Sequence, residues 1–168
     1  MLPKKRSSGF TLIELMFVMT IMGILATIGF AKYMEFNRRQ IVLQEARQLK
    51  SNLRLAQSKA LNTEIDLTVC MVGSTYGDGN DLSLDGWYVD FPSNQSYRIY
   101  GKCGAFSFAS QTYSTNSKVT FNPVPPSIIF RPSTQGVRLS SGNLPLSVNF
   151  QGFGIGQSVF IGASGEIK

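Results

Sequence analysis

Hydrophobic and polar positions follow three different patterns along the chain, and each pattern predicts a different kind of structure. Residues 10–31 are almost all apolar, residues 32–62 place apolar side chains three and four positions apart, and residues 63–168 contain short alternating runs. A uniformly apolar stretch indicates burial in lipid or protein, a period near 3.6 residues indicates an amphipathic helix, and alternation indicates strands. The patterning therefore predicts an α+β fold, in which one long helix precedes an antiparallel β-sheet domain.

The first apolar stretch is long enough to cross a membrane. Phe10 to Phe30 is 21 residues long, and a helix of about 20 residues spans the hydrocarbon core of a bilayer. Lys4, Lys5 and Arg6 precede it, which predicts that this end stays in the cytoplasm. A secretory signal peptide would have a shorter apolar core followed by a cleavage site between small residues. We therefore expect residues 10–31 to form a transmembrane helix.

One acidic residue, Glu14, interrupts this apolar stretch. A carboxylate in the middle of a bilayer costs about 3 kcal/mol on insertion scales, so such residues usually have a partner or a function. Glu14 lies only four residues from Phe10, where its side chain can reach the headgroups and water. That position explains why the glutamate is tolerated, but it does not explain why a glutamate is present.

The apolar residues of the second stretch lie on one face of a helix. They recur at alternating spacings of four and three, at Val42, Ala46, Leu49, Leu53, Ala56 and Ala60. Basic residues supply much of the opposite face, at Arg38, Arg39, Arg47, Lys50 and Arg54. Because no proline interrupts residues 10–62, we expect residues 32–62 to continue the membrane helix as an amphipathic spine for the sheet.

The charge of the chain is concentrated in this amphipathic helix. The whole chain has a formal net charge of +6, whereas residues 32–62 carry +5 and residues 63–168 carry −1. Two interpretations of the basic face stay open: an ordinary solvated surface, or a stripe that follows the phosphates of DNA. The nearly neutral remainder of the chain gives no independent indication of nucleic-acid binding.

Residues 63–168 are expected to form a β-rich globular head. Eight short strands are predicted, at residues 65–72, 86–91, 97–101, 118–122, 127–131, 146–150, 158–162 and 165–168, with turn-rich segments between them. The aromatic residues of this region are expected in the core: Trp87, Phe91, Phe106, Phe121, Phe130, Phe150 and Phe160.

The residue types argue against an enzyme. The chain contains no histidine, the commonest general base and the commonest transition-metal ligand, so no hydrolase triad can be built. The oxygen-rich run at residues 77–85, with Asp78, Asn80, Asp81 and Asp85, has Leu82 where an EF-hand loop needs a ligand. We interpret this run as a surface turn, and we expect no catalytic residues, no metal site and no cofactor.

The two cysteines, Cys70 and Cys103, are 33 positions apart and form no C-x-x-C pair. If this part of the chain lies outside the cytoplasm, a disulfide is expected. Closing a loop of that length would stabilise the fold by roughly 3 to 4 kcal/mol in the chain-entropy model. Two unrelated buried thiols are the alternative.

The start of the chain resembles a known family. The run GFTLIELM at residues 9–16, behind a short basic leader, is similar to the cleavage and assembly motif of type IV pilins and type II secretion pseudopilins. The resemblance implies that prepilin peptidase removes residues 1–9 by cutting between Gly9 and Phe10, and that the new amino terminus, Phe10, is N-methylated. Glu14 then becomes the fifth residue of the mature chain.

This resemblance also implies a partner for Glu14. Cleavage creates an α-amino group on Phe10, whose reference pKa is about 8. Glu14 of one subunit can then pair with that amine on a neighbouring subunit, and a missing partner would leave a desolvated charge. The implied partners are other pilin or pseudopilin subunits, the prepilin peptidase, inner-membrane lipid and the assembly platform.

A weaker, pattern-level resemblance covers most of the remaining chain. Residues 53–70, 85–91, 128–136 and 158–168 resemble the GspH/FimT-type minor pilins and pseudopilins. This resemblance implies a low-abundance subunit that waits in the inner membrane with one span and its head outside the cytoplasm. It would then be assembled into a pilus, a type II secretion pseudopilus or a tip complex.

The carboxyl-terminal segment departs from that resemblance. DNA-binding members are expected to end their last hairpin in a G-R-x-R-like basic motif, whereas this chain has Gly165-Glu166-Ile167-Lys168. Because phosphate contacts need positive charge, Glu166 speaks against DNA binding by this segment. A pilus-associated DNA receptor for uptake, binding through the helix, is the alternative function.

Overall fold

The computed structural model describes residues 9–70, 84–132 and 136–168. The chain divides into two compact units, one ending at Arg38 and the other comprising Arg39–Lys168. Helix α1 (Leu12–Leu61) contributes to both units, so the uninterrupted helix expected from the lack of proline is confirmed. Within the first unit, the hydroxyl groups of Thr20 and Thr27 donate hydrogen bonds to helix carbonyls one turn earlier.

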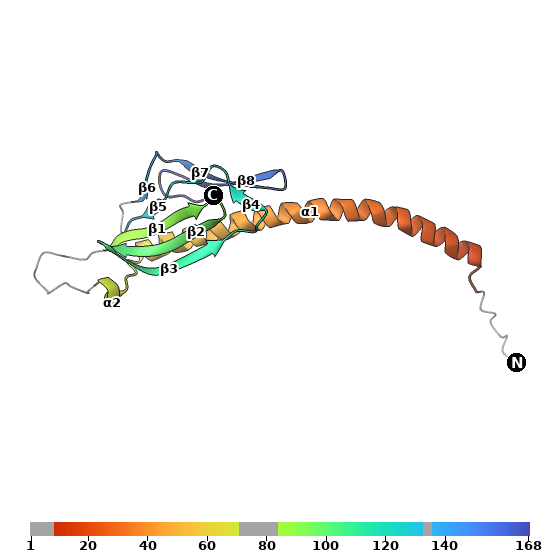
Figure 1. The fold of residues 1–168 in the computed structure, drawn as a ribbon, viewed down its shortest axis with the longest axis horizontal. Helices are drawn as coiled ribbons and strands as arrows, with labels where there is room; N and C mark the ends of the chain where they lie inside the picture. The colour runs from red at the N-terminus through yellow and green to blue at the C-terminus, as the bar shows by residue number, and fades with distance from the viewer. Residues whose placement is uncertain (1–8, 71–83, 133–135) are drawn as a thin grey trace, which may run out of the picture. The chain divides into compact units, whose positions relative to one another are not determined.

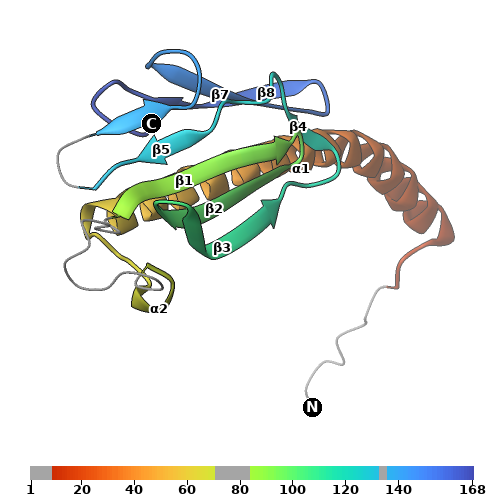
Figure 2. The same cartoon turned by 60° about the vertical axis from the view of Figure 1, so that its left-hand side comes forward.

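The second unit contains two antiparallel sheets (Figure 1). The five-stranded sheet has the order β3-β2-β1-β5-β6, from β1 (Leu84–Ser93), β2 (Ser96–Cys103), β3 (Phe106–Ser114), β5 (Ile128–Phe130) and β6 (Val137–Leu139). The three-stranded sheet has the order β4-β7-β8, from β4 (Val119–Phe121), β7 (Leu146–Gly152) and β8 (Ile155–Ile161). Figure 2 shows β1 and β2 lying along the second half of α1. The predicted α+β fold is therefore confirmed.

The predicted helix stripe forms the centre of the core. Val42, Ala46, Leu49, Leu53, Ala56 and Ala60 are each at most 8% exposed and belong to one cluster with residues of both sheets. Of the aromatic residues expected in the core, five are buried: Trp87, Phe91, Phe121, Phe130 and Phe150. The prediction for Phe106 is wrong, because this residue starts edge strand β3 and is 46% exposed, and Phe160 is only half-buried. Phe108 occupies the core instead.

Two predicted strands are not strands. Residues 67–70 of the first form the short helix α2 (Leu67–Cys70). The Asp66 carboxylate caps α2 by accepting hydrogen bonds from the Thr68 hydroxyl and backbone N–H, at 2.6 and 3.0 Å. These bonds lower the pKa of Asp66. At residues 165–168, a single bridge joins Ile167 to Ile161 in place of a strand.

Two strands, β3 and β6, were not predicted from the sequence. Strand β3 forms an edge of its sheet, and most of its side chains are exposed. It therefore does not need the apolar alternation that reveals a half-buried strand. Strand β6 has only three residues, none of them fully buried, so its pattern is too short to read.

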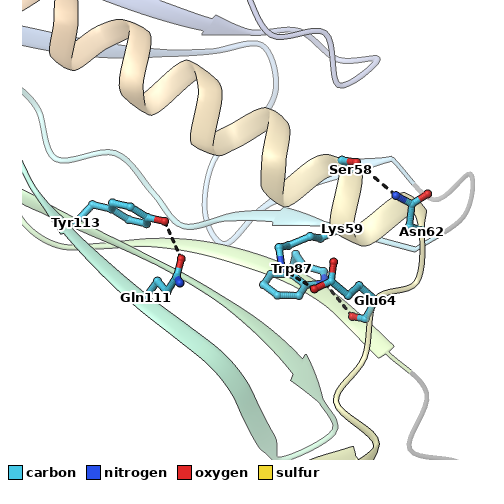
Figure 3. A network of polar contacts seen from close by, with 7 residues as sticks. All are labelled: Ser58, Lys59, Asn62, Glu64, Trp87, Gln111 and Tyr113. Atoms are coloured by element: carbon cyan, nitrogen blue, oxygen red, sulfur yellow. Dashed lines mark hydrogen bonds and ion pairs between the residues drawn. The ribbon is translucent and has the colours of Figure 1, made fainter.

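The end of α1 is tied to the centre of the five-stranded sheet (Figure 3). The indole Nε1 of Trp87 donates a hydrogen bond to the backbone carbonyl of Glu64, at 3.1 Å. The Lys59 ammonium lies 4.5 Å from the centre of the same indole and forms an ion pair with the Glu64 carboxylate. These contacts hold the residues that follow α1 against β1.

Candidate processing and assembly site

The expected cleavage site lies just outside helix α1. Gly9 and Phe10 precede the helix, and the side chain of Phe10 is 77% exposed. A Cβ atom added at Gly9 would meet no heavy atom of the described residues within 4 Å, so packing among those residues does not require glycine there. Gly9 and Phe10 are both exposed, so the peptide bond between them is open to solvent.

Thr11 and Glu14 begin the helix together. The Thr11 hydroxyl accepts a hydrogen bond from the backbone N–H of Glu14, at 3.4 Å, and the Thr11 carbonyl accepts the bond from Leu15, at 3.2 Å. This T-x-x-E spacing is that of a capping box, and an acidic group near a helix amino terminus is favoured by the helix dipole. This capping role was not predicted from the sequence, although the spacing of Thr11 and Glu14 indicates it.

The Glu14 carboxylate itself has no hydrogen bond or ion pair with the described residues. Its side chain is exposed, like those of the apolar residues around it. The site therefore combines an unpaired acidic group with an apolar helix surface, close to the peptide bond where cleavage is expected.

The helix surface next to this carboxylate is apolar and uncovered. Large apolar side chains are at least 45% exposed at Leu12, Ile13, Leu15, Met16, Phe17, Val18, Met19, Ile21, Met22, Ile24 and Leu25. In the described residues, α1 has the length and composition to cross a membrane, and none of its most apolar window is buried. An apolar surface of this extent needs lipid or another protein to cover it.

Cys70 and Cys103 form a disulfide in the structure, with an S–S distance of 2.09 Å and a Cα–Cα distance of 5.7 Å. Both residues are buried, and the bond joins α2 to the end of β2. Structural disulfides persist in oxidising compartments such as the bacterial periplasm. The bond therefore fits a head outside the cytoplasm.

The carboxyl-terminal segment packs against the head. Its backbone carbonyls accept hydrogen bonds from helix α1, Gly165 from Gln57 Nε2 at 2.9 Å and Ile167 from Arg54 at 3.2 Å. Glu166 Oε1 lies 2.9 Å from Lys168 Nζ. The basic group of this segment is therefore already paired with an acid, and Arg54 of the basic helix face is also engaged.

The oxygen-rich run at residues 77–85, which was compared with an EF-hand loop, lies only partly within the described residues. Asp78, Asn80 and Asp81 lie outside the described residues, whereas Asp85 is an exposed residue of β1. Among residues 9–70, 84–132 and 136–168, no three His, Cys, Asp or Glu side chains are grouped as a metal site would require.

Comparison with known proteins agrees with the amino-terminal site. The model of the prokaryotic N-terminal methylation motif matches residues 4–30, which include Gly9, Phe10 and Glu14. No curated protein and no solved structure matches the chain. This motif, the apolar helix that carries it and the antiparallel head that follows fit a membrane-anchored pilin. The amino-terminal motif thus marks the chain as a type IV pilin-like or pseudopilin-like prepilin.

Proposed function

We propose that this prepilin is a minor subunit of a type IV pilus or of a type II secretion pseudopilus, similar to the GspH/FimT type. Its function is structural: the head is carried into a filament or tip complex by the amino-terminal helix. The observation that carries this proposal is the apolar, uncovered surface of α1 between Leu12 and Leu25, which holds the unpaired carboxylate of Glu14.

Processing would occur at Gly9–Phe10. The exposure of Phe10 and the empty space around Gly9 support access by a prepilin peptidase at the cytoplasmic face of the membrane. Cleavage would remove Lys4, Lys5 and Arg6, the charges that hold this end in the cytoplasm. N-methylation of Phe10 would follow.

Glu14 would act as the assembly contact. Its backbone N–H is satisfied by Thr11, but its carboxylate has no cation near it within the described subunit. The α-amino group of Phe10 on a neighbouring subunit would supply that cation once cleavage has taken place. Because an unpaired charge in an apolar environment is costly, subunits that place the two groups together would be favoured.

Before assembly, the subunit would be a single-span protein of the inner membrane. The basic residues before the helix support a cytoplasmic amino terminus, and the Cys70–Cys103 disulfide supports a periplasmic head. Residues 10–31 would lie in the bilayer, and the head would begin within the amphipathic residues 32–62.

A DNA receptor is the alternative function, and the carboxyl-terminal segment does not favour it. The Glu166 carboxylate forms an ion pair with Lys168, and the Arg54 guanidinium donates a hydrogen bond to the backbone carbonyl of Ile167. A receptor would therefore depend on other cations of α1, such as Arg39 and Arg47, which are exposed. Salt-independent or absent DNA binding by the full chain would rule this alternative out.

The processing step is tested by the intact mass of the protein from a bacterium that has a prepilin peptidase. We expect the mass of residues 10–168 plus one methyl group in the native host, and the mass of the full chain in a host without the peptidase. A native protein that keeps residues 1–9 would contradict the proposal.

A further inference from the structure

An open groove crosses the three-stranded sheet of the head. It encloses about 470 Å³ and is lined by Asn122, Asn149, Gln151, Gly156, Gln157 and Ser158. These residues come from β7, β8 and the segment after β4, three segments that lie side by side (Figure 1). The groove is open to solvent, so a ligand would lie along the surface of the sheet and not inside a closed pocket.

The groove offers hydrogen-bonding groups without charge. None of its lining side chains is ionisable, although the chain contains 26 Lys, Arg, Asp and Glu residues. The Asn122 side-chain amide donates to Gln151 Oε1 at 2.8 Å, and the Asn122 backbone N–H donates to the carbonyl of Asn149 at 3.1 Å. These bonds fix one wall of the groove. The side chains of Asn149 and Ser158, which are cross-strand partners on the same face of the sheet, have no hydrogen-bond partner among the described residues.

Gly156 keeps the groove open, and no described residue lies close enough to require a glycine there. At Gly101 a Cβ atom would lie 2.2 Å from the ring of Phe108, and at Gly152 it would lie 2.8 Å from the carbonyl of Lys118, so packing requires both glycines. At Gly156 the nearest atom, the Phe150 carbonyl oxygen, is 3.9 Å away, and φ is not in the left-handed region. Glycine inside a strand weakens the strand, and it often marks a place where a ligand or another backbone approaches.

The chemistry of the groove favours a saccharide over a peptide. Strand β7 is already paired on both sides, with β4 and β8, so a peptide could not form backbone hydrogen bonds with the strand that carries Asn149 and Gln151. Phe150 is the apolar lining residue, and it is only 1% exposed, so the groove has no apolar pocket for an anchoring side chain. Side-chain amides and a hydroxyl are donors and acceptors that match the hydroxyl and acetamido groups of an uncharged sugar.

We propose that this groove is a binding site for a neutral oligosaccharide, with Gly156 as its floor and with the amides of Asn149 and Gln151 and the hydroxyl of Ser158, which the strand register places on one face of the sheet, as its hydrogen-bonding groups. The site would give the head a receptor function, and it would not depend on how the helix assembles.

The test uses the full chain in phospholipid nanodiscs, because maltoside detergents would themselves present a sugar. Saturation-transfer NMR is recorded with two neutral trisaccharides, maltotriose and triacetylchitotriose, with trigalacturonic acid as a charged probe and with an uncharged Gly-Ser peptide. We expect transfer to at least one neutral trisaccharide, and none to the charged probe or the peptide.

Three variants locate the site. Gly156→Thr fills the groove with a residue that favours strands, so the affinity should fall at least tenfold while the Tm is unchanged or higher. Asn149→Ala should also weaken binding, and Ser147→Thr, on β7 outside the groove, should not. The proposal is overturned if neither trisaccharide receives saturation, if Gly156→Thr binds as well as the unmodified chain, or if the peptide binds in place of the sugars.

Discussion

The Trp87 indole N–H and the Glu64 carbonyl, 3.1 Å apart, join the centre of the five-stranded sheet to the segment that follows α1. Trp87 is 1% exposed, so no water can easily replace this bond. The contact is thus both a packing contact and a polar one.

Replacing Trp87 by phenylalanine should therefore destabilise the head. Trp87→Phe removes the N–H donor, shrinks a buried side chain and removes a contact of the Lys59 ammonium. We expect a loss of about 2 to 4 kcal/mol in the free energy of unfolding. Tyr113→Phe is the control, because its hydroxyl donates to the exposed side chain of Gln111 (Figure 3), and it should cost less than about 1 kcal/mol. Urea denaturation of both variants measures the difference, and equal losses would contradict the role of the Trp87–Glu64 bond.

Glu14→Gln should separate membrane insertion from assembly. The glutamine keeps the backbone hydrogen bond to Thr11 and removes the charge, so insertion of α1 should be unchanged or slightly easier. Incorporation into filaments should fall at least tenfold, because the amine of Phe10 loses its partner. Glu35→Gln is the matched control on the same helix, where Glu35 faces the exposed ammonium of Lys32 at 3.6 Å. Immunoblotting of sheared filaments against the membrane fraction gives the ratio, and unaltered incorporation of Glu14→Gln would refute the pairing.

Removing the disulfide should lower stability without changing the fold. Cys103→Ser together with Cys70→Ser opens the loop that the bond closes over a separation of 33 residues. The expected loss is about 3 to 4 kcal/mol in the chain-entropy model. Guanidinium denaturation of the unmodified chain with and without reductant should show a similar difference, whereas the double variant should not respond to reductant.

The head should lose stability at alkaline pH. Burial is the main reason that the pKa of Tyr97 is raised to about 12, from 10. Because the folded pKa is the higher one, the folded state holds this proton when the unfolded state has lost it. Stability is therefore full below pH 10 and falls as the pH rises towards about 12.

Tyr97→Phe tests this dependence. The variant also loses the 2.7 Å hydrogen bond from Asn52, so its absolute stability falls. Its slope of stability against pH between 10 and 12 should nevertheless become shallower. Tm values measured across that range give the slope, and an unchanged slope would show that Tyr97 is not the group responsible.

The parts of this protein that the sequence could predict are those in which one pattern dominates. The stripe from Val42 to Ala60 repeats over five intervals, so its burial follows from helical geometry. The GFTLIELM run at residues 9–16 is specific because it combines a glycine, an aromatic residue and a glutamate at fixed spacing at the start of an apolar stretch. The long helix follows from the absence of proline.

The parts that could not be predicted depend on contacts made after folding. Strand β3 is polar because it lies at an edge, and its place is set by pairing with β2. The segment around Cys70 has the β-branched residues of a strand, but the Asp66 cap makes a helix of residues 67–70. The groove on β7 and β8 joins residues from Asn122 to Ser158, and no local pattern links them.

The covalent ring closed by Cys70 and Cys103 contains all of β1 and all of β2. A single cut by an extracellular protease anywhere between the two cysteines would therefore leave both fragments attached to each other. Such a nicked head would migrate as one species on a non-reducing gel and as two on a reducing gel. If the head lies outside the cytoplasm, as we propose, the subunit would in this way keep its head after a single cut.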